Sequence, residues 1–317
     1  MQDAISFLYL GGIRVQNIQK QHRTGAVIEL KSGIVDAIIA WNCKLHSERR
    51  CRMNSTGFQL TVFGARGSMT VCRKDTTVFG GDTSCYLVQA GEESIFLDAG
   101  SGLIAAPVSF PRTPVILLSH LHLDHVLGLG MYPRMAMKGM KTALYLPAAS
   151  SEEAVSVLDS LYTPPFWPLH LSDYAGDLQV EPLRFPLTIG EVLVEGMAGN
   201  HPGDCAVMRL HYRGKSLVYV TDYEYEEASF QRLAAFARDT DLLLYDGQYD
   251  AKTYEQRKGF GHSTPDRGLE LMGLCGAKRL LLIHHDPLSS DDELQKREYA
   301  INRTDVRFAR VGDIIEL

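Results

Sequence analysis

Short apolar runs separated by turns make up most of the chain between residues 53 and 220. Some of them alternate apolar and polar residues, which is the period of a strand with one buried face. Others are continuous, which is typical of strands buried on both faces. This pattern predicts strands at residues 59–63, 85–89, 94–97, 115–119, 143–146, 192–194, 206–211 and 216–220.

Longer stretches with helical spacing of the apolar residues also occur, mainly in the last third of the chain. They predict helices at residues 152–161, 225–238, 265–275 and 291–300, with strands at 242–245 and 279–283 between the later helices. Asp241 and Asp246 flank the first of these two strands. Clusters of strands with helices between them favour two sheets packed face to face, with the helices outside, over a single parallel sheet.

The first 52 residues differ from the rest in charge and in pattern. They contain eight basic and four acidic residues, a net charge of +4, which leaves −10 for the remainder of a chain whose total is −6. Apart from apolar stretches at 26–30 and 34–41, they show no sustained period. We therefore predict that residues 1–52 are an extension of unknown role, and that residues 53–317 form a single domain beginning at Met53.

Composition and charge exclude several classes of protein. Of the 317 residues, 45% are hydrophobic and 22% are charged, as in ordinary globular proteins. A net charge of −6 has the wrong sign for a protein that grips nucleic acid phosphates, so we expect no stable nucleic-acid partner. The six cysteines form no CxxC pair and show no regular spacing, which favours reduced thiols over a disulfide framework.

Targeting signals are not evident in the sequence. No apolar run approaches the roughly 18 residues that a membrane span needs. Asp3 stands where a signal peptide needs a cationic start. We expect a cytoplasmic protein without a membrane partner, and the sequence is compatible with a homodimer.

The strongest chemical signal directly follows the predicted strand at 115–119. There the chain continues with His120, His122, Asp124 and His125 in the pattern HxHxDH. This pattern should arise by chance in on the order of one chain in a thousand of this length, so chance explains it poorly. The alternative is a polar loop whose histidines only cap a following helix.

Three later apolar runs end in the same way. Alone, each of their histidines is more often a structural residue than a ligand, but four such strand ends together favour a metal centre. The later residues are His201 after the run at 192–198, Asp222 after 217–221, and the neighbours His284 and His285 after 280–283.

On these residues the chain resembles the metallo-β-lactamase superfamily, from about Met53 to the C-terminus. The resemblance implies an α/β fold, the αββα sandwich of two mixed sheets flanked by helices. It also implies that Asp98, in Leu97-Asp98-Ala99-Gly100, is a buried support of the ligand loop. The superfamily's HxHxDH motif, later histidine, bridging aspartate and terminal histidine are matched in order by His120, His122, Asp124, His125, His201, Asp222 and His284.

The same resemblance implies two divalent metal ions, with Zn²⁺ favoured over Mn²⁺ or Fe²⁺, and attack on the substrate by a bridging hydroxide. One ion would be held by His120, His122 and His201, and the other by Asp124, His125 and His284, with Asp222 between them. Asp124 would thereby belong to the catalytic residues. His285 remains the rival of His284, because neighbouring side chains leave a strand in opposite directions.

Residues 261–265, Gly-His-Ser-Thr-Pro, resemble the histidine loops of the tRNA 3′-processing endonucleases and of the phosphoribosyl cyclic phosphodiesterases. Cleavage of a phosphate ester expels an alkoxide, so a positioned acid accelerates it, and His262 is the candidate. Ser263 and Thr264 are candidate substrate contacts. Alternatively, one of them caps the following helix, with Pro265 in its first turn.

Residues 63–68 and 80–85 resemble the opening of bacterial phosphodiesterase-like members of the superfamily. Arg66 in the first of these stretches has two open interpretations. It could pin a phosphate of the substrate, or it could tie its loop to the backbone.

We therefore expect a phosphodiesterase that acts on a small cyclic nucleotide or sugar cyclic phosphate. His201 and Asp222 are only 21 residues apart, which leaves no room for the arm that tRNA processors place there. β-Lactamases usually carry Cys or His in place of Asp222. The alternatives are a tRNA 3′-processing-type endonuclease, a glyoxalase II-like thioesterase and a non-catalytic scaffold that retains the fold.

Overall fold

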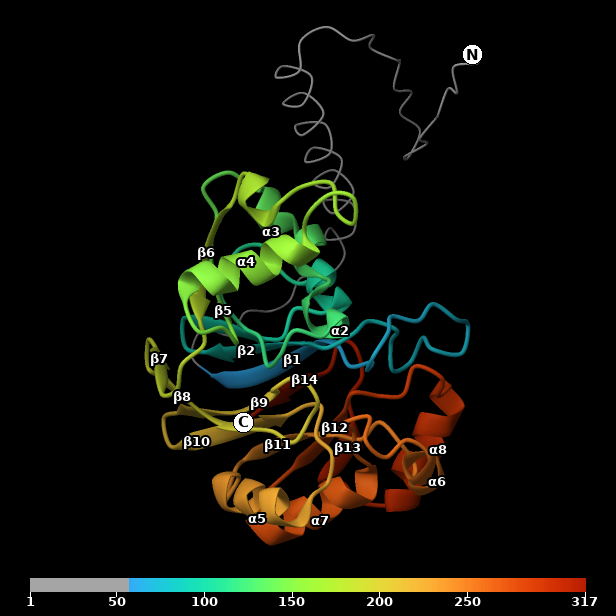
Figure 1. Ribbon diagram of the computed structural model, residues 1–317. Coiled ribbons are helices and arrows are strands. Elements are labelled where there is room, and N and C mark those ends of the chain that lie inside the picture. The colour runs from blue at the N-terminus through green and yellow to red at the C-terminus, as the bar shows by residue number, and fades with distance from the viewer. Residues whose placement is uncertain (1–56) are drawn as a thin grey trace, which may run out of the picture.

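The computed structural model describes residues 57–317, so the predicted extension and its boundary at Met53 lie outside the described residues. Within 57–317 the chain forms two seven-stranded mixed sheets that pack face to face, with helices on both outer faces (Figure 1). This arrangement confirms the predicted αββα sandwich.

The first sheet contains all but two of its strands where the sequence predicts them. Its antiparallel half pairs β14, β1, β2 and β3, and its parallel half continues through β4, β5 and β6. The bounds are β1 Phe58–Gly64, β2 Cys85–Ala90, β3 Glu93–Leu97, β4 Val115–Leu117, β5 Lys141–Leu146, β6 Asp177–Pro182 and β14 Ile314–Glu316. The unpredicted strands, β6 and β14, are the two edges of the sheet, where alternate residues stay exposed to solvent.

The second sheet has the order β13-β12-β11-β10-β9-β8-β7. Its strands are β7 Leu187–Ile189, β8 Val192–Ala198, β9 Ala206–Tyr212, β10 Lys215–Val220, β11 Leu242–Asp246, β12 Leu280–Ile283 and β13 Val306–Phe308. β10 to β13 are parallel, and β8 runs in the same direction because both β8 and β10 are antiparallel to β9. The ends of β8, β10, β11 and β12 therefore meet at one edge of the sandwich.

The four predicted helices are present, each within two residues of its expected bounds: α4 Ser151–Leu161, α5 Glu227–Phe236, α7 Pro265–Cys275 and α8 Asp291–Ile301. α4 covers the first sheet, whereas α5 and α7 cover the second (Figure 1). Three short helices escape sequence analysis because they last about one turn: α2 Leu123–Val126, α3 Pro133–Ala136 and α6 Ala251–Gln256. In residues 57–317, none of the helices is long and apolar enough to cross a membrane.

The strands whose sequences are continuously apolar are buried on both faces. β10, β11 and β12 lie between the other sheet and the layer of α5 and α7, and nearly all of their residues are buried. Side chains from both sheets, among them Leu60, Leu117, Leu217 and Leu281, form the core between the sheets. This core holds the two sheets in register, so that loops from both converge at one edge.

Candidate metal centre

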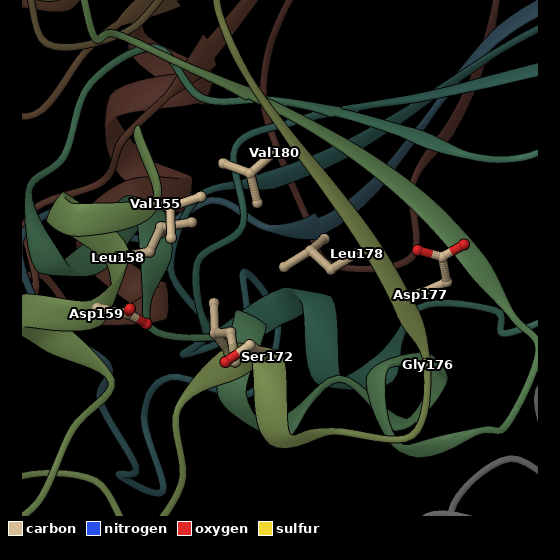
Figure 2. A pocket seen from close by; sticks show the side chains of 9 residues that line it. Val155, Leu158, Asp159, Ser172, Gly176, Asp177, Leu178 and Val180 are labelled. Carbon is tan, nitrogen blue, oxygen red and sulfur yellow. The ribbon is translucent and has the colours of Figure 1, made fainter. Parts of the chain in front are cut away.

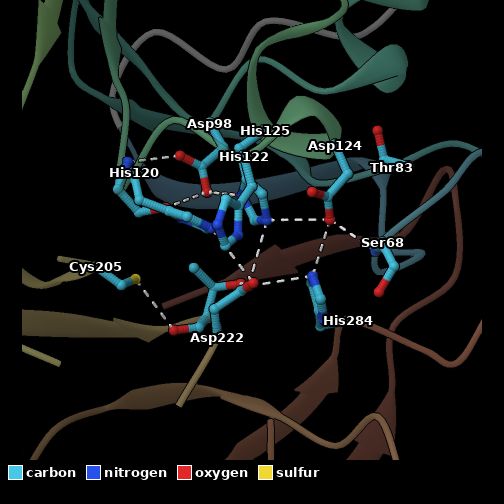
Figure 3. Close-up of polar contacts among 12 residues, drawn as sticks. Ser68, Thr83, Asp98, His120, His122, Asp124, His125, Cys205, Asp222 and His284 are labelled. Atoms are coloured by element: carbon cyan, nitrogen blue, oxygen red, sulfur yellow. Dashed lines mark hydrogen bonds and ion pairs between the residues drawn. The ribbon is translucent and has the colours of Figure 1, made fainter. Parts of the chain in front are cut away.

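The loop after β4 is held by a buried aspartate at the end of β3. Asp98 accepts hydrogen bonds from Ser119 N (2.6 Å) and Ser119 Oγ (2.8 Å), and lies 2.7 Å from Nδ1 of His125. Tyr219 of the opposite sheet also donates to Asp98, at 2.6 Å. Asp98 thus supports the loop and holds His125 from the Nδ1 side of its ring, in agreement with the role that the family resemblance implies (Figure 3).

Two groups of side chains could each hold a metal ion, and Asp222 belongs to both (Figure 3). Oδ2 of Asp222 lies 3.5 Å from His120 Nε2 and 3.6 Å from His201 Nε2. Its other oxygen, Oδ1, lies 3.3 Å from His125 Nε2 and 3.1 Å from His284 Nε2. One carboxylate oxygen therefore faces each group, as a bridging ligand requires. The first group is completed by His122 and the second by Asp124.

The imidazoles are oriented as metal ligands are. Nδ1 of His201 donates to the carbonyl of Gly261 at 2.8 Å, and Nδ1 of His284 donates to Gln248 Oε1 at 2.8 Å. Each of these bonds leaves the lone pair on Nε2, which points into the cluster. Among the described residues, the buried Nε2 atoms of His120 and His125 have no hydrogen-bond partner. An unpaired buried nitrogen costs about 1–3 kcal/mol, and a cation would remove that cost. The residues present therefore fit a metal centre.

The buried carboxylates of the cluster also favour positive charge on their neighbours. Burial disfavours the charged carboxylate of Asp222, but the imidazoles of His284 and His125 outweigh burial and hold its pKa well below the usual range. Burial likewise disfavours the imidazolium of His284, yet Asp222 and hydrogen bonding to Asp124 raise its pKa to about 9.

The neighbours His284 and His285 point in different directions and have different surroundings. His284 adopts φ +58 and turns its ring into the cluster. His285 donates from Nε2 to the carbonyl of Ala309 at 2.8 Å and packs against Phe79 and Phe308. Burial lowers the pKa of His285 to about 3, so it stays neutral in the core. Of the two, only His284 faces the cluster.

The turn that contains Gly67 packs closely against the ring of His284. A Cβ at Gly67 would lie 2.3 Å from Nδ1 of His284, so a side chain cannot be accommodated there. Ser68, which follows with φ +61, donates its backbone amide to Asp124 Oδ2 at 2.7 Å. Gln248 connects the loop of Ser68 to the loop of His284. Its amide nitrogen donates to Ser68 Oγ at 3.2 Å, and its Oε1 accepts from His284 Nδ1. Ser68 and Gln248 escape sequence analysis because single polar loop residues give no pattern.

His262 lies beside the two groups. Its Nδ1 is 3.0 Å from Asp246 Oδ2 and 3.9 Å from Asp222 Oδ2, and its ring centroid is 4.9 Å from that of His284. Asp246 is fully buried at the end of β11. Sequence analysis does not assign Asp246 to the site, although it ends an apolar strand much as Asp222 follows one, and that signal could identify it.

Asp246, His262 and His284 are also close enough to form a third metal-binding group. However, Nδ1–H of His284 donates to Gln248, so Nε2 is the one ring atom of His284 that could bind an ion. Nε2 lies 3.2 Å from Asp124 Oδ2 and 3.1 Å from Asp222 Oδ1, in the second group. An ion in the third group would therefore compete with one in the second, and His262 fits better as a group outside the ligand set.

Ser263 and Thr264 make hydrogen bonds within the fold, and their contact with substrate stays a prediction. The hydroxyl of Ser263 is fully buried and lies 2.9 Å from the hydroxyl of Tyr245. Thr264 Oγ1 accepts from the amide of Arg267 at 3.3 Å and so caps α7. The capping alternative is confirmed for Thr264.

Arg66 makes its hydrogen bonds within the fold, and its contact with substrate stays a prediction. Its side chain is fully buried. Nε donates to the carbonyl of Gly80 at 2.8 Å, and Nη1 donates to the carbonyls of Asp286 (3.0 Å) and Ser289 (2.8 Å). These bonds tie the β1–β2 connection to the loop after β12 and use Nε and Nη1, so that of the guanidinium nitrogens only the buried Nη2 has no hydrogen-bond partner among the described residues.

We expect Arg66→Met to lower the free energy of unfolding by about 3 kcal/mol, because it leaves three carbonyls without their charged donor. Denaturant unfolding measures this loss. The exposed Arg112, which pairs with Glu92, is the matched control, and Arg112→Met should unfold almost as the wild type does. Unchanged stability of Arg66→Met together with a raised KM would instead restore Arg66 as a substrate contact.

A separate cavity lies between α4 and β6 (Figure 2). Val155 and Leu158 of α4 and Leu178 and Val180 of β6 form apolar walls, and Asp159 lies at its rim. Its lining contains no histidine or cysteine, so it offers none of the chemistry of the metal centre.

Comparison with known proteins agrees with this geometry. The model of the beta-lactamase superfamily domain matches residues 93–285, more than half of the chain. The chain belongs to the metallo-β-lactamase superfamily. The prediction made from the histidine and aspartate pattern is thereby confirmed, and the superfamily assignment supports a metal-dependent hydrolase.

Individual relatives within the superfamily are distant. "Probable metallo-hydrolase YhfI" of Bacillus subtilis is 24% identical over 264 residues, which span 81% of this chain and 99% of YhfI. The crystal structure of YhfI superposes with a TM-score of 0.64, covering 83% of this chain and all of YhfI. Ribonuclease Z of Ignicoccus hospitalis is 26% identical over 231 residues, 59% of this chain and 77% of the enzyme. A diphosphatase from the PhnP family shares the fold at 17% identity, with a TM-score of 0.61 over 82% of this chain and 98% of that protein.

Proposed function

We propose that the protein is a dinuclear metal-dependent phosphodiesterase that cleaves a small diester, such as a cyclic nucleotide or a sugar cyclic phosphate. One observation carries the proposal: His262, fixed by Asp246, stands beside two ligand groups that share Asp222. Esters of phosphate need an acid for the departing alkoxide, and His262 lies where such an acid would act.

The protein's own residues divide into ligands and an acid. His120, His122 and His201 would hold one ion, Asp124, His125 and His284 the other, and Asp222 would contribute one oxygen to each. When bound, such a pair of divalent ions supplies an activated water and neutralises charge on the phosphoryl group. Zn²⁺ is the proposed ion, with Mn²⁺ and Fe²⁺ as alternatives, since imidazole and carboxylate ligands suit all three.

Asp246 sets the tautomer of His262. Because Nδ1–H donates to the Asp246 carboxylate, the proton to be transferred must be on Nε2. Nε2 makes no hydrogen bond with another described residue, so it is available to a substrate oxygen. The neutral imidazole left after transfer remains held by Asp246, ready to be protonated again.

A small substrate is supported by the short connection between His201 and Asp222. In this stretch β9 and β10 form a simple hairpin joined at Tyr212 and Lys215, without an inserted arm. The charge of −10 on residues 53–317 also disfavours folded RNA. A ribonuclease is the second candidate, favoured by the relatives named ribonuclease Z. A screen over cyclic nucleotides, sugar cyclic phosphates, linear diesters and a tRNA precursor discriminates between the two.

The purified protein should contain about two equivalents of divalent metal per chain, because its ligands divide into two groups. Elemental analysis measures the metal. A chelator should abolish diester hydrolysis, and adding Zn²⁺ or Mn²⁺ back should restore it. A protein that binds no metal even after reconstitution would contradict the dinuclear centre, and turnover of the tRNA precursor alone would replace the small diester with RNA.

A further inference from the structure

The carboxylate of Glu224 accepts two hydrogen bonds from the loop that carries His262. Glu224 Oε1 accepts a hydrogen bond from the amide of Gly259 at 2.6 Å, and Oε2 accepts one from the amide of Gly261 at 2.9 Å. The two oxygens thus hold two amides on either side of Phe260. Glu224 itself is half-buried and lies two residues after Asp222.

Glu224 also makes backbone hydrogen bonds to the loop that carries His201. Its backbone amide donates to the carbonyl of Asn200 at 2.8 Å, and Nδ2 of Asn200 donates back to the carbonyl of Glu224 at 2.9 Å. His201, which follows Asn200, donates from Nδ1 to the carbonyl of Gly261. The loops of His201, Asp222 and His262 are therefore connected to one another around Glu224.

The other contacts to the His262 loop lie at its two ends: Arg257 Nη1 is 3.4 Å from Asp286 Oδ2, and His262 Nδ1 is 3.0 Å from Asp246 Oδ2. Phe260 is 61% exposed, and the preceding helix α6 has no buried residue. Gly259 and Gly261 adopt φ +90 and +88, a region that glycine enters freely, so the backbone provides little stiffness of its own. A Cβ at Gly261 would lie 2.1 Å from Nδ1 of His201, so the loop also cannot be stiffened by a side chain there.

We propose that Glu224 is a positioning residue for His262: it holds the 257–262 loop against the ligand loops and thereby aims the imidazole. Its catalytic effect rests on the proposed function, whereas its hold on the loop does not. A misplaced acid loses much of its effect, because general acid catalysis depends on a heavy-atom distance of about 2.6–3.2 Å.

We expect Glu224→Ala to lower kcat by about 10- to 100-fold on diesters with alkoxide leaving groups, the usual effect of removing a hydrogen-bonding group that orients a site residue. On a p-nitrophenyl diester, whose leaving group needs little protonation, the loss should be much smaller. Metal content should stay near two equivalents. Glu224→Gln should recover part of the loss, because its amide oxygen can still accept from one of the two amides. It also serves as the test variant if the alanine variant does not fold.

The matched control is Glu255→Gln, at an exposed carboxylate of α6 that pairs with Lys258, a residue of the same loop. It should retain wild-type kcat on both substrates. In the double variant Glu224→Ala, His262→Ala, the loss on the alkoxide substrate should equal that of His262→Ala alone, because the two residues act through one proton transfer. Additive losses would overturn the proposal.

Hydrogen exchange followed by mass spectrometry tests the hold on the loop without any substrate. Glu224→Ala should speed exchange in residues 257–262, whereas Glu255→Gln should not. Unchanged exchange, equal losses on both diesters, or a fall in metal content would each overturn the positioning role. If the wild-type protein cleaves no diester, the proposed function fails while faster exchange still confirms that Glu224 holds the loop.

Discussion

The Asp222→Ala variant should contain less metal than the wild-type protein and lose activity by at least about 10³-fold. Each oxygen of Asp222 faces a different ligand group, so one substitution removes a ligand from both. It also removes the buried charge that balances the surrounding imidazoles. Elemental analysis and diester hydrolysis, measured on the same preparation, test the two effects together.

Two further variants sharpen this test. Asp222→Asn keeps the volume and one oxygen but loses the charge, so it should bind metal more weakly than wild type and better than the alanine variant. Asp305→Asn removes an exposed carboxylate that pairs with Arg303, and it should leave metal content and activity unchanged. Normal turnover by Asp222→Ala would exclude a bridging role.

Replacing His262 with alanine should separate acid catalysis from metal binding. Both metals should remain, because His262 lies outside the two groups that share Asp222. On diesters with alkoxide leaving groups kcat should fall by about 10²- to 10⁴-fold, the usual worth of a positioned acid. On a p-nitrophenyl diester the fall should be much smaller. Steady-state kinetics on the two substrates measures the difference.

His211 is the matched control for this variant. It is a partly exposed histidine on β9 that pairs with Glu195 at 2.7 Å, and His211→Ala should behave as wild type on both substrates. Equal losses on both diesters would mean that His262 binds or orients the phosphate rather than protonating the leaving group. A drop in metal content would make His262 a ligand.

Much of the fold could be predicted because its central strands are buried on both faces. Continuous apolar runs such as β11 and β12 are visible without knowledge of their neighbours. The edge strands β6, β7, β13 and β14 are short or half exposed. Only pairing defines them, β7 in a hairpin with β8 and the other three with strands more distant in the sequence. Local pattern therefore identifies the centre of each sheet and misses its margins.

The site shows a similar division. The HxHxDH motif is contiguous, so sequence spacing alone brings His120 to His125 together. The choice between His284 and His285 depends on a backbone turn with positive φ, which the residue types do not reveal. Arg66 has two plausible roles, and its burial against backbone carbonyls, which no local pattern reveals, favours the role of tying loops together. Contacts between loops that are distant in the sequence explain what local pattern could not predict.

Each ligand group combines residues from both halves of the sandwich. His120 to His125 follow β4 of the first sheet, whereas His201, Asp222 and His284 follow strands of the second. A bound ion would therefore act as a cross-link between the two sheets at this edge. By mass action, binding to the folded chain alone shifts the folding equilibrium, by about 2.7 kcal/mol when the free ion is at 100 times its dissociation constant. The ions would thus be part of what keeps the two halves of the protein together, as well as part of its chemistry.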